Sequence, residues 1–279
     1  MHVTISGEVY EEYLMGRTTA EYERLHLQAL RLEPVTFRVL QQAGLKKGMN
    51  CLDVGCGTGD VMRLMGSIVT ASGNVTGIDI DKKIGEEALG MLRNLNNSNY
   101  NFQPDDITTC KLTAEKYDFV FARLVLIHLT NPVEMIKKLF DAVKPGGVLL
   151  IQDYDFTTLK VGKKPSYLTD YIRQLLFEVF LKTGKDPEIG TNLSEYFVES
   201  GIGIPDGTDA SSIITSFYEA AAYIKDGTKS MQPAFLKLNL TTSDKLNQFL
   251  LDLDEYSINE KNLFGVLPML GSAWKKKIR

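Results

Sequence analysis

Cysteine is scarce in this chain, which has three cysteines among 279 residues: Cys51, Cys56 and Cys110. Their spacing fits neither a zinc motif nor a disulfide framework, so a fold held by metal or disulfides is not expected. No apolar run is long enough to cross a bilayer, and the N-terminus carries no signal-peptide pattern. These absences predict a protein of a reducing, cytoplasmic compartment.

An excess of positive charge is also missing. The chain has 31 Lys and Arg residues against 35 Asp and Glu residues, which gives a net charge of −4. This balance argues against a nucleic-acid surface, which is usually basic. The hydrophobic content of 44% is ordinary for a globular protein. The length suits one large domain or a domain with a cap, and we expect residues 1–279 to form a single domain.

The most informative segment is the run CLDVGCGTGD at residues 51–60. A short apolar strand turns through Gly55, Gly57 and Gly59 into an apolar helix pattern. Glycines tolerate positive φ and let a ligand lie against bare backbone. The N-terminus of the following helix offers unpaired N–H groups to an anion. The run therefore predicts a ligand site at the carboxyl end of a parallel strand.

Strands and helices alternate through the first half of the chain. Strands are predicted at 50–54, 74–78, 101–103, 117–122 and 148–153, and helices at 60–69, 83–95 and 132–143. Alternation at this spacing indicates βαβ units, a parallel sheet and right-handed crossovers. The sequence therefore predicts an α/β fold.

The two ends of the chain are predicted to be mainly helical. Residues 18–43 have helical spacing, and Pro34 is expected to separate two helices. Later helices are predicted at 167–182, 192–200, 215–225, 232–240 and 243–256, with strands at 202–205 and 263–270. The long helical stretch predicts an insertion that packs over the sheet edge as a cap. We expect an N-terminal helical cap at 1–47, a binding core at 48–160 and a C-terminal half at 161–279.

Several motifs together resemble a known family. The acid Asp53 stands two residues before Gly55, where dinucleotide-binding folds usually have apolar residues. The run resembles motif I of class I S-adenosylmethionine (SAM) methyltransferases, and the segments at 117–129 and 144–153 resemble motifs IV and V. The match spans 48–153 and is similar to the small-molecule branch related to quinone-biosynthesis methyltransferases.

The resemblance implies a Rossmann-like, mostly parallel sheet of seven strands, the last one antiparallel, with helices on both faces. It also implies SAM as the cofactor and S-adenosylhomocysteine as the product, bound in part by Asp53, Gly55 and Gly57. Cys56 lies inside the turn, where its size matters more than its thiol chemistry.

Acids after the next two strands are further candidates for the cofactor site. Asp79, followed by Ile80, lies about 20 residues beyond the glycine turn, a spacing at which an acid reaches ribose hydroxyls. The alternative is a solvated aspartate at a strand end. Asp106 and Ile107 resemble the family segment that recognises adenine, and Asp106 is preferred to Asp105. Two acids in a surface turn remain the alternative.

Four other residues are candidates for the site. Arg123 follows a strand at a position that lines the cofactor pocket in relatives. Tyr13 lies in a segment that resembles the aromatic-glycine segment closing over SAM, where an aromatic face attracts the sulfonium; packing on the first helix is the alternative. Arg24 could reach the methionine carboxylate. His128 is a candidate general base, but a histidine in an apolar helical stretch is often structural.

The predicted reaction follows from the cofactor. SAM carries its own leaving group, so the protein mainly aligns a nucleophile with the methyl group and excludes water. The chain lacks the Asn-Pro-Pro-Tyr type of motif typical of amide or amine methylation on macromolecules. We therefore expect a small, partly apolar acceptor, no metal, no nucleic acid, no membrane span, and a monomer or homodimer.

Two other functions stay open. They are an NAD(P)-dependent oxidoreductase on a Rossmann sheet and a non-catalytic SAM-binding regulatory protein. The accepting atom and the need for a base also stay open. Aromatic residues of the second half are possible acceptor contacts, although core packing is favoured for most of them: Phe177, Phe180, Tyr196, Phe197, Phe217, Tyr218 and Tyr223.

Overall fold

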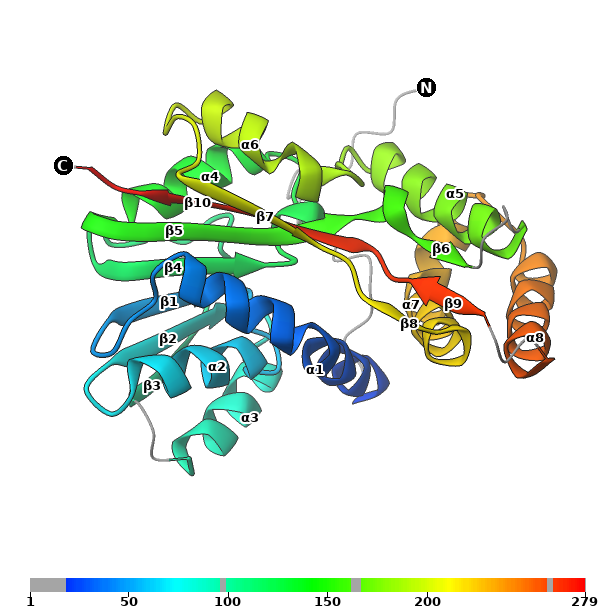
Figure 1. Ribbon diagram of the computed structural model, residues 1–279, viewed down its shortest axis with the longest axis horizontal. Helices are drawn as coiled ribbons and strands as arrows, with labels where there is room; N and C mark the ends of the chain where they lie inside the picture. Colours follow the sequence, from blue (N-terminus) through cyan, green and yellow to red (C-terminus); the bar gives the residue numbers. More distant parts are fainter. Residues whose placement is uncertain (1–18, 96–98, 162–166, 260–262, 279) are drawn as a thin grey trace, which may run out of the picture.

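A seven-stranded sheet forms the centre of the molecule (Figure 1). The computed structural model describes residues 19–95, 99–161, 167–259 and 263–278. The strand order is β3-β2-β1-β4-β5-β10-β7. The strands are β1 (Asn50–Val54), β2 (Asn74–Asp79), β3 (Asn99–Pro104), β4 (Tyr117–Arg123), β5 (Val143–Asp155), β7 (Gly207–Ser211) and β10 (Met269–Lys276). The first five pair in parallel, and β10 runs antiparallel to both β5 and β7. The predicted seven-stranded, mostly parallel sheet with an antiparallel last strand is confirmed.

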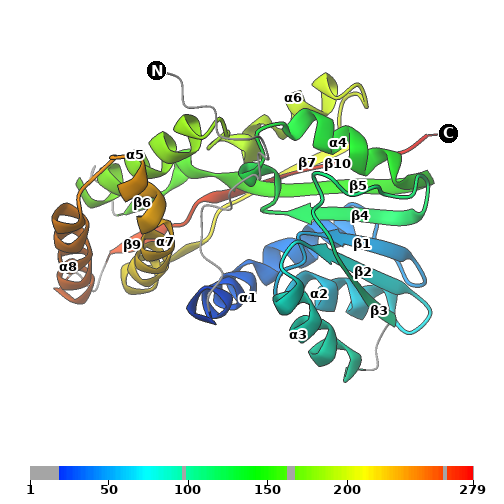
Figure 2. The same cartoon turned by 180° about the vertical axis from the view of Figure 1, so that it is seen from behind.

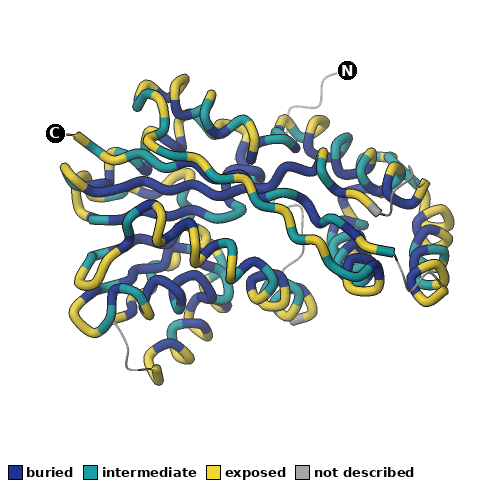
Figure 3. Tube along the Cα trace, in the orientation of Figure 1, coloured by how far each residue is buried: buried dark blue, intermediate teal, exposed yellow. Residues whose placement is uncertain are grey.

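Helices cover both faces of this sheet (Figures 1 and 2). One face carries α1 (Thr19–Gln42), α2 (Asp60–Val69) and α3 (Lys82–Arg93), and the other carries α4 (Pro132–Asp141) and α6 (Ile189–Glu199). Side chains of a strand alternate between faces. Phe119 and Phe121 accordingly join the apolar cluster that contains α1 and α2, whereas Val120 and Ala122 join the cluster that contains α4. The central strands are therefore buried on both sides (Figure 3).

Two helices begin where the sequence supplies a capping side chain. The Asp81 carboxylate accepts hydrogen bonds from the backbone N–H groups of Lys83 (3.1 Å) and Ile84 (3.3 Å), so α3 begins at the next residue, Lys82. Asn131 caps α4 in the same way, and Pro132 occupies a first-turn position that needs no N–H donor. These local rules explain why the predicted starts of both helices lie within one residue of the observed starts.

The second half of the chain adds a group of elements beyond the carboxyl ends of the parallel strands. They are α5 (Tyr167–Lys182), α7 (Phe217–Lys237), α8 (Ser243–Asn259) and a small sheet of β6 (Lys160–Val161), β9 (Phe264–Val266) and β8 (Ile214–Ser216). Figure 1 shows this group at the right, next to the N-terminal end of α1. The predicted helical insertion is present, and it includes a second sheet that was not predicted.

Two helices are longer than predicted, and each of them contains a proline. Pro34 lies inside the continuous helix α1, and Pro233 lies inside α7, which replaces the two predicted helices at 215–225 and 232–240. A proline removes one backbone hydrogen bond but does not prevent a kinked helix from continuing. Burial on both sides of each proline favours continuation: Leu32 and Leu40 flank the first, and Met231 and Phe235 the second.

The last two main-sheet strands were misplaced. The predicted strand at 202–205 is wrong, because this segment is a turn region in which Gly203 has a φ of 88°. The edge strand is β7, whose half-buried polar sequence carries little hydrophobic signal. The predicted strand at 263–270 is two strands, because the chain leaves the small sheet after Val266 and enters the main sheet at Met269.

Helix α6 approaches the sheet closely at two glycines, and this contact gives a test of the packing. A Cβ added to Gly271 would lie 1.8 Å from the carbonyl oxygen of Gly190. Gly271→Ala is therefore expected to lower the free energy of unfolding by about 1–3 kcal/mol, because the helix must move away. Urea denaturation measures the change.

Gly90→Ala in α3 is the control, because a Cβ there meets no atom within 4 Å. It is expected to raise stability by about 0.5–1 kcal/mol. Equal stability of Gly271→Ala and the native chain would contradict the proposed contact.

Candidate active site

A cavity of about 290 Å³ lies at the carboxyl ends of the parallel strands. Its lining includes the loops after β1, β2 and β4, and it extends to α1, α5 and α7. The strand order reverses between β1 and β4, which are neighbours in the sheet but not in sequence. Open α/β sheets bind ligands at such a switch point. The position of the cavity therefore agrees with the ligand site predicted from the glycine turn.

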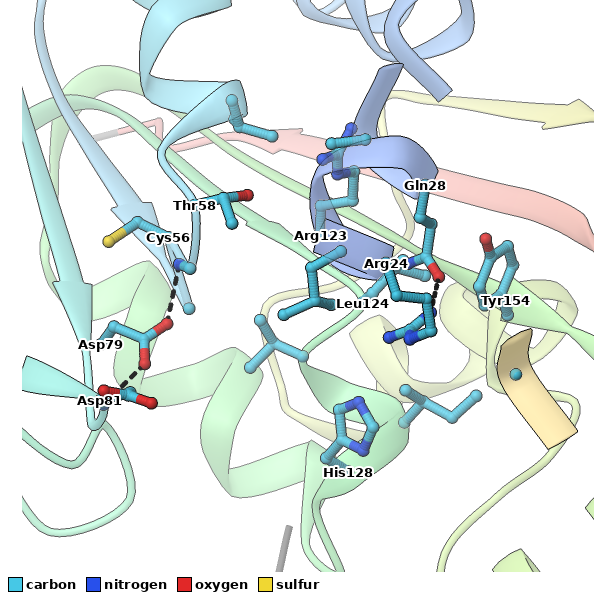
Figure 4. A pocket seen from close by; sticks show the side chains of 18 of the residues that line it. Arg24, Gln28, Cys56, Thr58, Asp79, Asp81, Arg123, Leu124, His128 and Tyr154 are labelled. Atoms are coloured by element: carbon cyan, nitrogen blue, oxygen red, sulfur yellow. Dashed lines mark hydrogen bonds between the residues drawn. The ribbon is translucent and has the colours of Figure 1, made fainter. Parts of the chain in front are cut away.

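The structure brings the predicted site residues together. Ten of them line this cavity: Asp53, Gly55, Cys56, Gly57, Asp79, Ile80, Asp106, Ile107, Arg123 and His128. Figure 4 shows how Cys56, Asp79, Arg123 and His128 lie around it. Tyr13 lies outside the described residues. The individual roles of the ten residues remain predictions.

The glycine turn is held by the end of the neighbouring strand. Gly55, Gly57 and Gly59 have φ angles of 65°, 45° and 76°, a region that favours glycine. One Asp79 carboxylate oxygen accepts from the backbone N–H of Gly57 at 2.8 Å, and the other accepts from that of Asp81 at 2.8 Å (Figure 4). The residue predicted to bind ribose therefore also fixes the shape of the turn.

The loop after β4 packs directly against this turn. A Cβ on Gly55 would lie 2.6 Å from a methyl carbon of Val125. The adjacent residue, Leu124, has a φ of 57°, which is unusual for a residue with a side chain. Such backbone strain concentrates at functional sites. Leu124 lines the cavity, and the sequence analysis missed it because nothing in the residue type predicts this conformation.

Asp53 is a buried carboxyl group beneath the turn. Its side chain is 1% exposed, and among the described residues its Oδ2 atom has no hydrogen-bond partner. Burial raises the pKa of Asp53 to about 8, the nearby Arg123 guanidinium opposes this rise, and Asp79 adds to it. A buried polar atom without a partner is rare. Asp53 is therefore able to accept a hydrogen bond from a ligand.

Arg123 connects the cavity to a buried polar chain. Its Nη1 donates to Thr36 Oγ1 at 3.1 Å, and Thr36 donates to Gln152 Oε1 at 2.8 Å. Gln152 in turn donates to Ser272 Oγ at 3.1 Å. Burial lowers the pKa of Arg123, while Asp53 raises it. These bonds join α1, β4, β5 and β10 behind the cavity.

The environment of His128 favours a structural role over a catalytic one. Burial lowers the pKa of His128 to about 3, and the positive charges of Lys185 and Arg24 lower it further. The imidazole is therefore neutral at pH 7 but a weak proton acceptor. General-base catalysis is most efficient when the pKa is near the operating pH. The catalytic assignment made from sequence thus gains no support from the electrostatics.

Helix α1 supplies polar side chains whose contacts the sequence did not predict. The Arg24 guanidinium donates to both carboxylate oxygens of Glu21, at 2.9 and 2.6 Å, and to Gln28 Oε1 at 2.7 Å. Arg24 lines the cavity, but these bonds engage its guanidinium. The Tyr22 hydroxyl donates to Asp81 at 2.7 Å and so joins α1 to the start of α3. Tyr22 and Asp81 are 59 positions apart, so their contact leaves no local signal in the sequence.

The aromatic residues of the second half mostly belong to the core, as favoured from sequence. Phe197 and Phe217 are buried in the core cluster, and Tyr218 is 67% exposed. Phe177 and Tyr196 pack on the core cluster without lining the cavity. Phe180 and Tyr223 do line it, and Tyr154 also does, although the sequence analysis had not named Tyr154.

The family assignment agrees with this geometry. A family model described as a methyltransferase domain matches residues 45–186, just over half of the chain. The chain therefore belongs to the methyltransferase domain family, which confirms the resemblance seen in the motifs.

Relatives with curated names support the same family. A demethylmenaquinone methyltransferase of Staphylococcus aureus (strain MRSA252) is 27% identical over 152 residues, 54% of this chain and 62% of that protein. A ubiquinone biosynthesis O-methyltransferase of Coxiella burnetii (strain Dugway 5J108-111) is 31% identical over 162 residues, 58% of this chain and 64% of that protein. The chain thus matches less than two thirds of the length of either relative.

Solved structures show the same fold. The crystal structure of a putative methyltransferase from Bacillus halodurans superposes with a TM-score of 0.58 at 16% identity. The superposition covers 88% of this chain and 99% of that one. Because the identity is low, this similarity concerns the fold alone.

The buried carboxyl of Asp53 predicts a pH-dependent stability. Its folded-state pKa of about 8 lies well above the ordinary pKa of an aspartate, 3.8. The favourable contribution of the protonated form is therefore complete at low pH and is lost as the pH rises towards 8. Asp53→Asn, which is always neutral, should gain stability over the native chain between about pH 5 and pH 8, by up to about 1.4 kcal/mol per pH unit.

Urea denaturation at several pH values in this range checks this prediction. Asp170→Asn is the control, because Asp170 lies on α5 with a side chain that is 50% exposed. A stability difference for Asp53→Asn that stays constant with pH would show that Asp53 is ionised in the folded protein.

Proposed function

We propose that this chain is a SAM-dependent methyltransferase that transfers a methyl group to a small, partly apolar metabolite by in-line displacement. The observation that carries the proposal is a single cavity with two chemically different halves. Its polar half contains the glycine turn and the acids after β2 and β3, and its apolar half is formed largely by α5 and α7. A methyl donor and an acceptor can therefore lie side by side in one cavity.

The polar half suits the three parts of SAM. The Oδ2 atom of the buried Asp53 carboxyl can accept a hydrogen bond from the ammonium group of the methionine part, and that positive charge would favour the ionised form of Asp53. Asp79 lies at the end of β2, where an acid reaches ribose hydroxyls. Asp106 Oδ1 accepts from the N–H and hydroxyl of Thr108 at 2.8 and 2.7 Å, and its other oxygen can accept from the adenine amino group. SAM supplies the activated methyl group when bound.

The apolar half and the names of the relatives support an acceptor class. One relative is named as a demethylmenaquinone methyltransferase and another as a ubiquinone biosynthesis O-methyltransferase, and we propose a quinone-related acceptor for this chain as well. Membership of the methyltransferase family does not favour the oxidoreductase alternative. Non-catalytic SAM binding remains an outcome of the test below.

The organisation and setting of the protein are part of the proposal. The chain would use residues 1–47 as an N-terminal cap, 48–160 as the SAM-binding core and 161–279 as the acceptor-binding half. It would act in the cytoplasm as a monomer or homodimer. In the described part of the chain, we find no helix whose length and apolar character would let it cross a membrane.

Asp79→Ala tests the cofactor assignment. Loss of hydrogen bonds to an ionised group costs about 1.5–3 kcal/mol, so the dissociation constant for SAM should rise about 10- to 100-fold. Calorimetry with SAM and S-adenosylhomocysteine measures this change, with Asp170→Ala on α5 as an exposed control. Equal SAM affinity of Asp79→Ala and the native protein would remove the ribose assignment.

A transfer assay tests the reaction itself. With methyl-labelled SAM, the native protein should label a reduced naphthoquinone or a substituted phenol, and phosphoethanolamine should remain unlabelled. Calorimetry with NAD on the same sample tests the oxidoreductase alternative, which predicts that the protein binds NAD. Tight SAM binding without transfer to any acceptor would favour the regulatory alternative, and failure to bind SAM or S-adenosylhomocysteine would contradict the proposal.

A further inference from the structure

The acceptor half of the cavity is almost entirely apolar. Its side chains include Phe156, Leu159, Ile172, Leu176, Phe180 and Met231. The rings of Phe156 and Phe180 stack with centroids 5.4 Å apart. Among the described residues that α5, α7 and the segment 154–159 contribute to the lining, none is Asp, Glu, Lys or Arg. Arg24 of α1 also lines the cavity, but Glu21 and Gln28 accept hydrogen bonds from its guanidinium. A charged acceptor would therefore lose its hydration here without gaining an uncommitted ionic partner.

Helices α5 and α7 and the segment 154–159 contribute three polar side chains to the lining, and each of them carries a hydroxyl group. They belong to Tyr154, Tyr223 and Thr228. The Thr228 hydroxyl donates its proton to the carbonyl oxygen of Ile224 at 2.7 Å, so it is used within α7. The two tyrosines remain as groups able to recognise a ligand.

The two tyrosine hydroxyls form a directed pair. Tyr223 donates to the Tyr154 oxygen at 2.8 Å. A hydroxyl has one proton to donate and two acceptor sites. Tyr154 accepts from Tyr223 with its oxygen, and its own proton can therefore point to a group in the cavity. Arg31 of α1 lies over the Tyr223 ring, 5.7 Å from its centroid, and helps to fix that ring in place.

Tyr154 is suited to donate a proton in a hydrogen bond and not to remove one. Its side chain is 6% exposed, and burial raises its pKa well above the ordinary value for tyrosine. The phenol therefore stays protonated at neutral pH. Figure 4 shows Tyr154 on the far side of Arg24 and Gln28 from the glycine turn, away from Asp79.

We propose that Tyr154, oriented by Tyr223, determines acceptor specificity by donating a hydrogen bond to an oxygen atom of a neutral, planar, apolar acceptor such as a phenol or hydroquinone. This inference rests on the proposed methyltransferase function and names the substrate class of the same site. The stacked rings of Phe156 and Phe180 hold the apolar body, and Tyr154 selects an acceptor that carries oxygen at the correct place.

Binding of two matched probes tests the inference without requiring turnover. The probes are 1-naphthol and naphthalene, which differ by one hydroxyl group. Equilibrium dialysis at saturating S-adenosylhomocysteine should show that the native protein binds 1-naphthol about tenfold more tightly, as expected for one hydrogen bond of ordinary net strength. In Tyr154→Phe this advantage should fall to less than about threefold, while naphthalene affinity stays unchanged.

Two further variants separate specificity from structure. Tyr223→Phe should reduce the 1-naphthol advantage partially, because Tyr154 loses the group that orients it. Tyr167→Phe is the control, because Tyr167 is 63% exposed on α5 and does not line the cavity. It should behave as the native protein does. All three variants should bind S-adenosylhomocysteine with native affinity, which shows that they are folded.

The outcomes distinguish this inference from the proposed function. If the native protein fails to bind S-adenosylhomocysteine, the proposed function is wrong. If it binds S-adenosylhomocysteine but Tyr154→Phe keeps the full preference for 1-naphthol, the tyrosine assignment is wrong. Binding of phosphoethanolamine more tightly than 1-naphthol would overturn the neutral substrate class.

Discussion

The whole site depends on the two hydrogen bonds that the Asp79 carboxylate accepts from the backbone of Gly57 and Asp81. They join the loop after β1 to the end of β2 and hold the glycine turn open towards the cavity. The turn then has no room to relax on its other side, because the Val125 side chain contacts Gly55. A ligand therefore meets a preformed backbone surface, and little ordering is needed on binding.

A buried carboxyl group positions the loop after β4, which lines the cavity. Asp153, fully buried on β5, accepts from the backbone N–H of Ile127 at 3.2 Å and from that of Tyr154 at 3.0 Å. Burial raises the pKa of Asp153 to about 7, whereas these backbone hydrogen bonds lower it. One carboxyl group thus orients both the loop that carries His128 and the backbone of Tyr154. The lowered pKa of His128 does not favour proton transfer, and its catalytic role stays a prediction.

The sequence predicted the parts of the structure whose signals are local. The glycine turn, the start of α3 and the strongly apolar strands β1, β4 and β5 were placed within a few residues, except that β5 begins earlier at Val143. Errors occurred where tertiary burial outweighs a local rule, as at Pro34, or where an edge strand has few apolar residues, as in β7. The strained backbone of Leu124 had no local signal at all.

The residues of the cofactor half can be predicted from the sequence more readily than those of the acceptor half. The cofactor residues follow successive strands, and parallel strands bring their carboxyl ends to one edge, so order along the chain predicts proximity. Tyr154 and Tyr223 are 69 positions apart, and only the packing of α7 beside the end of β5 joins their hydroxyls. Because this contact depends on helix packing outside the βαβ core, relatives with the same glycine turn can differ in it. Acceptor specificity can therefore change while the cofactor site stays the same.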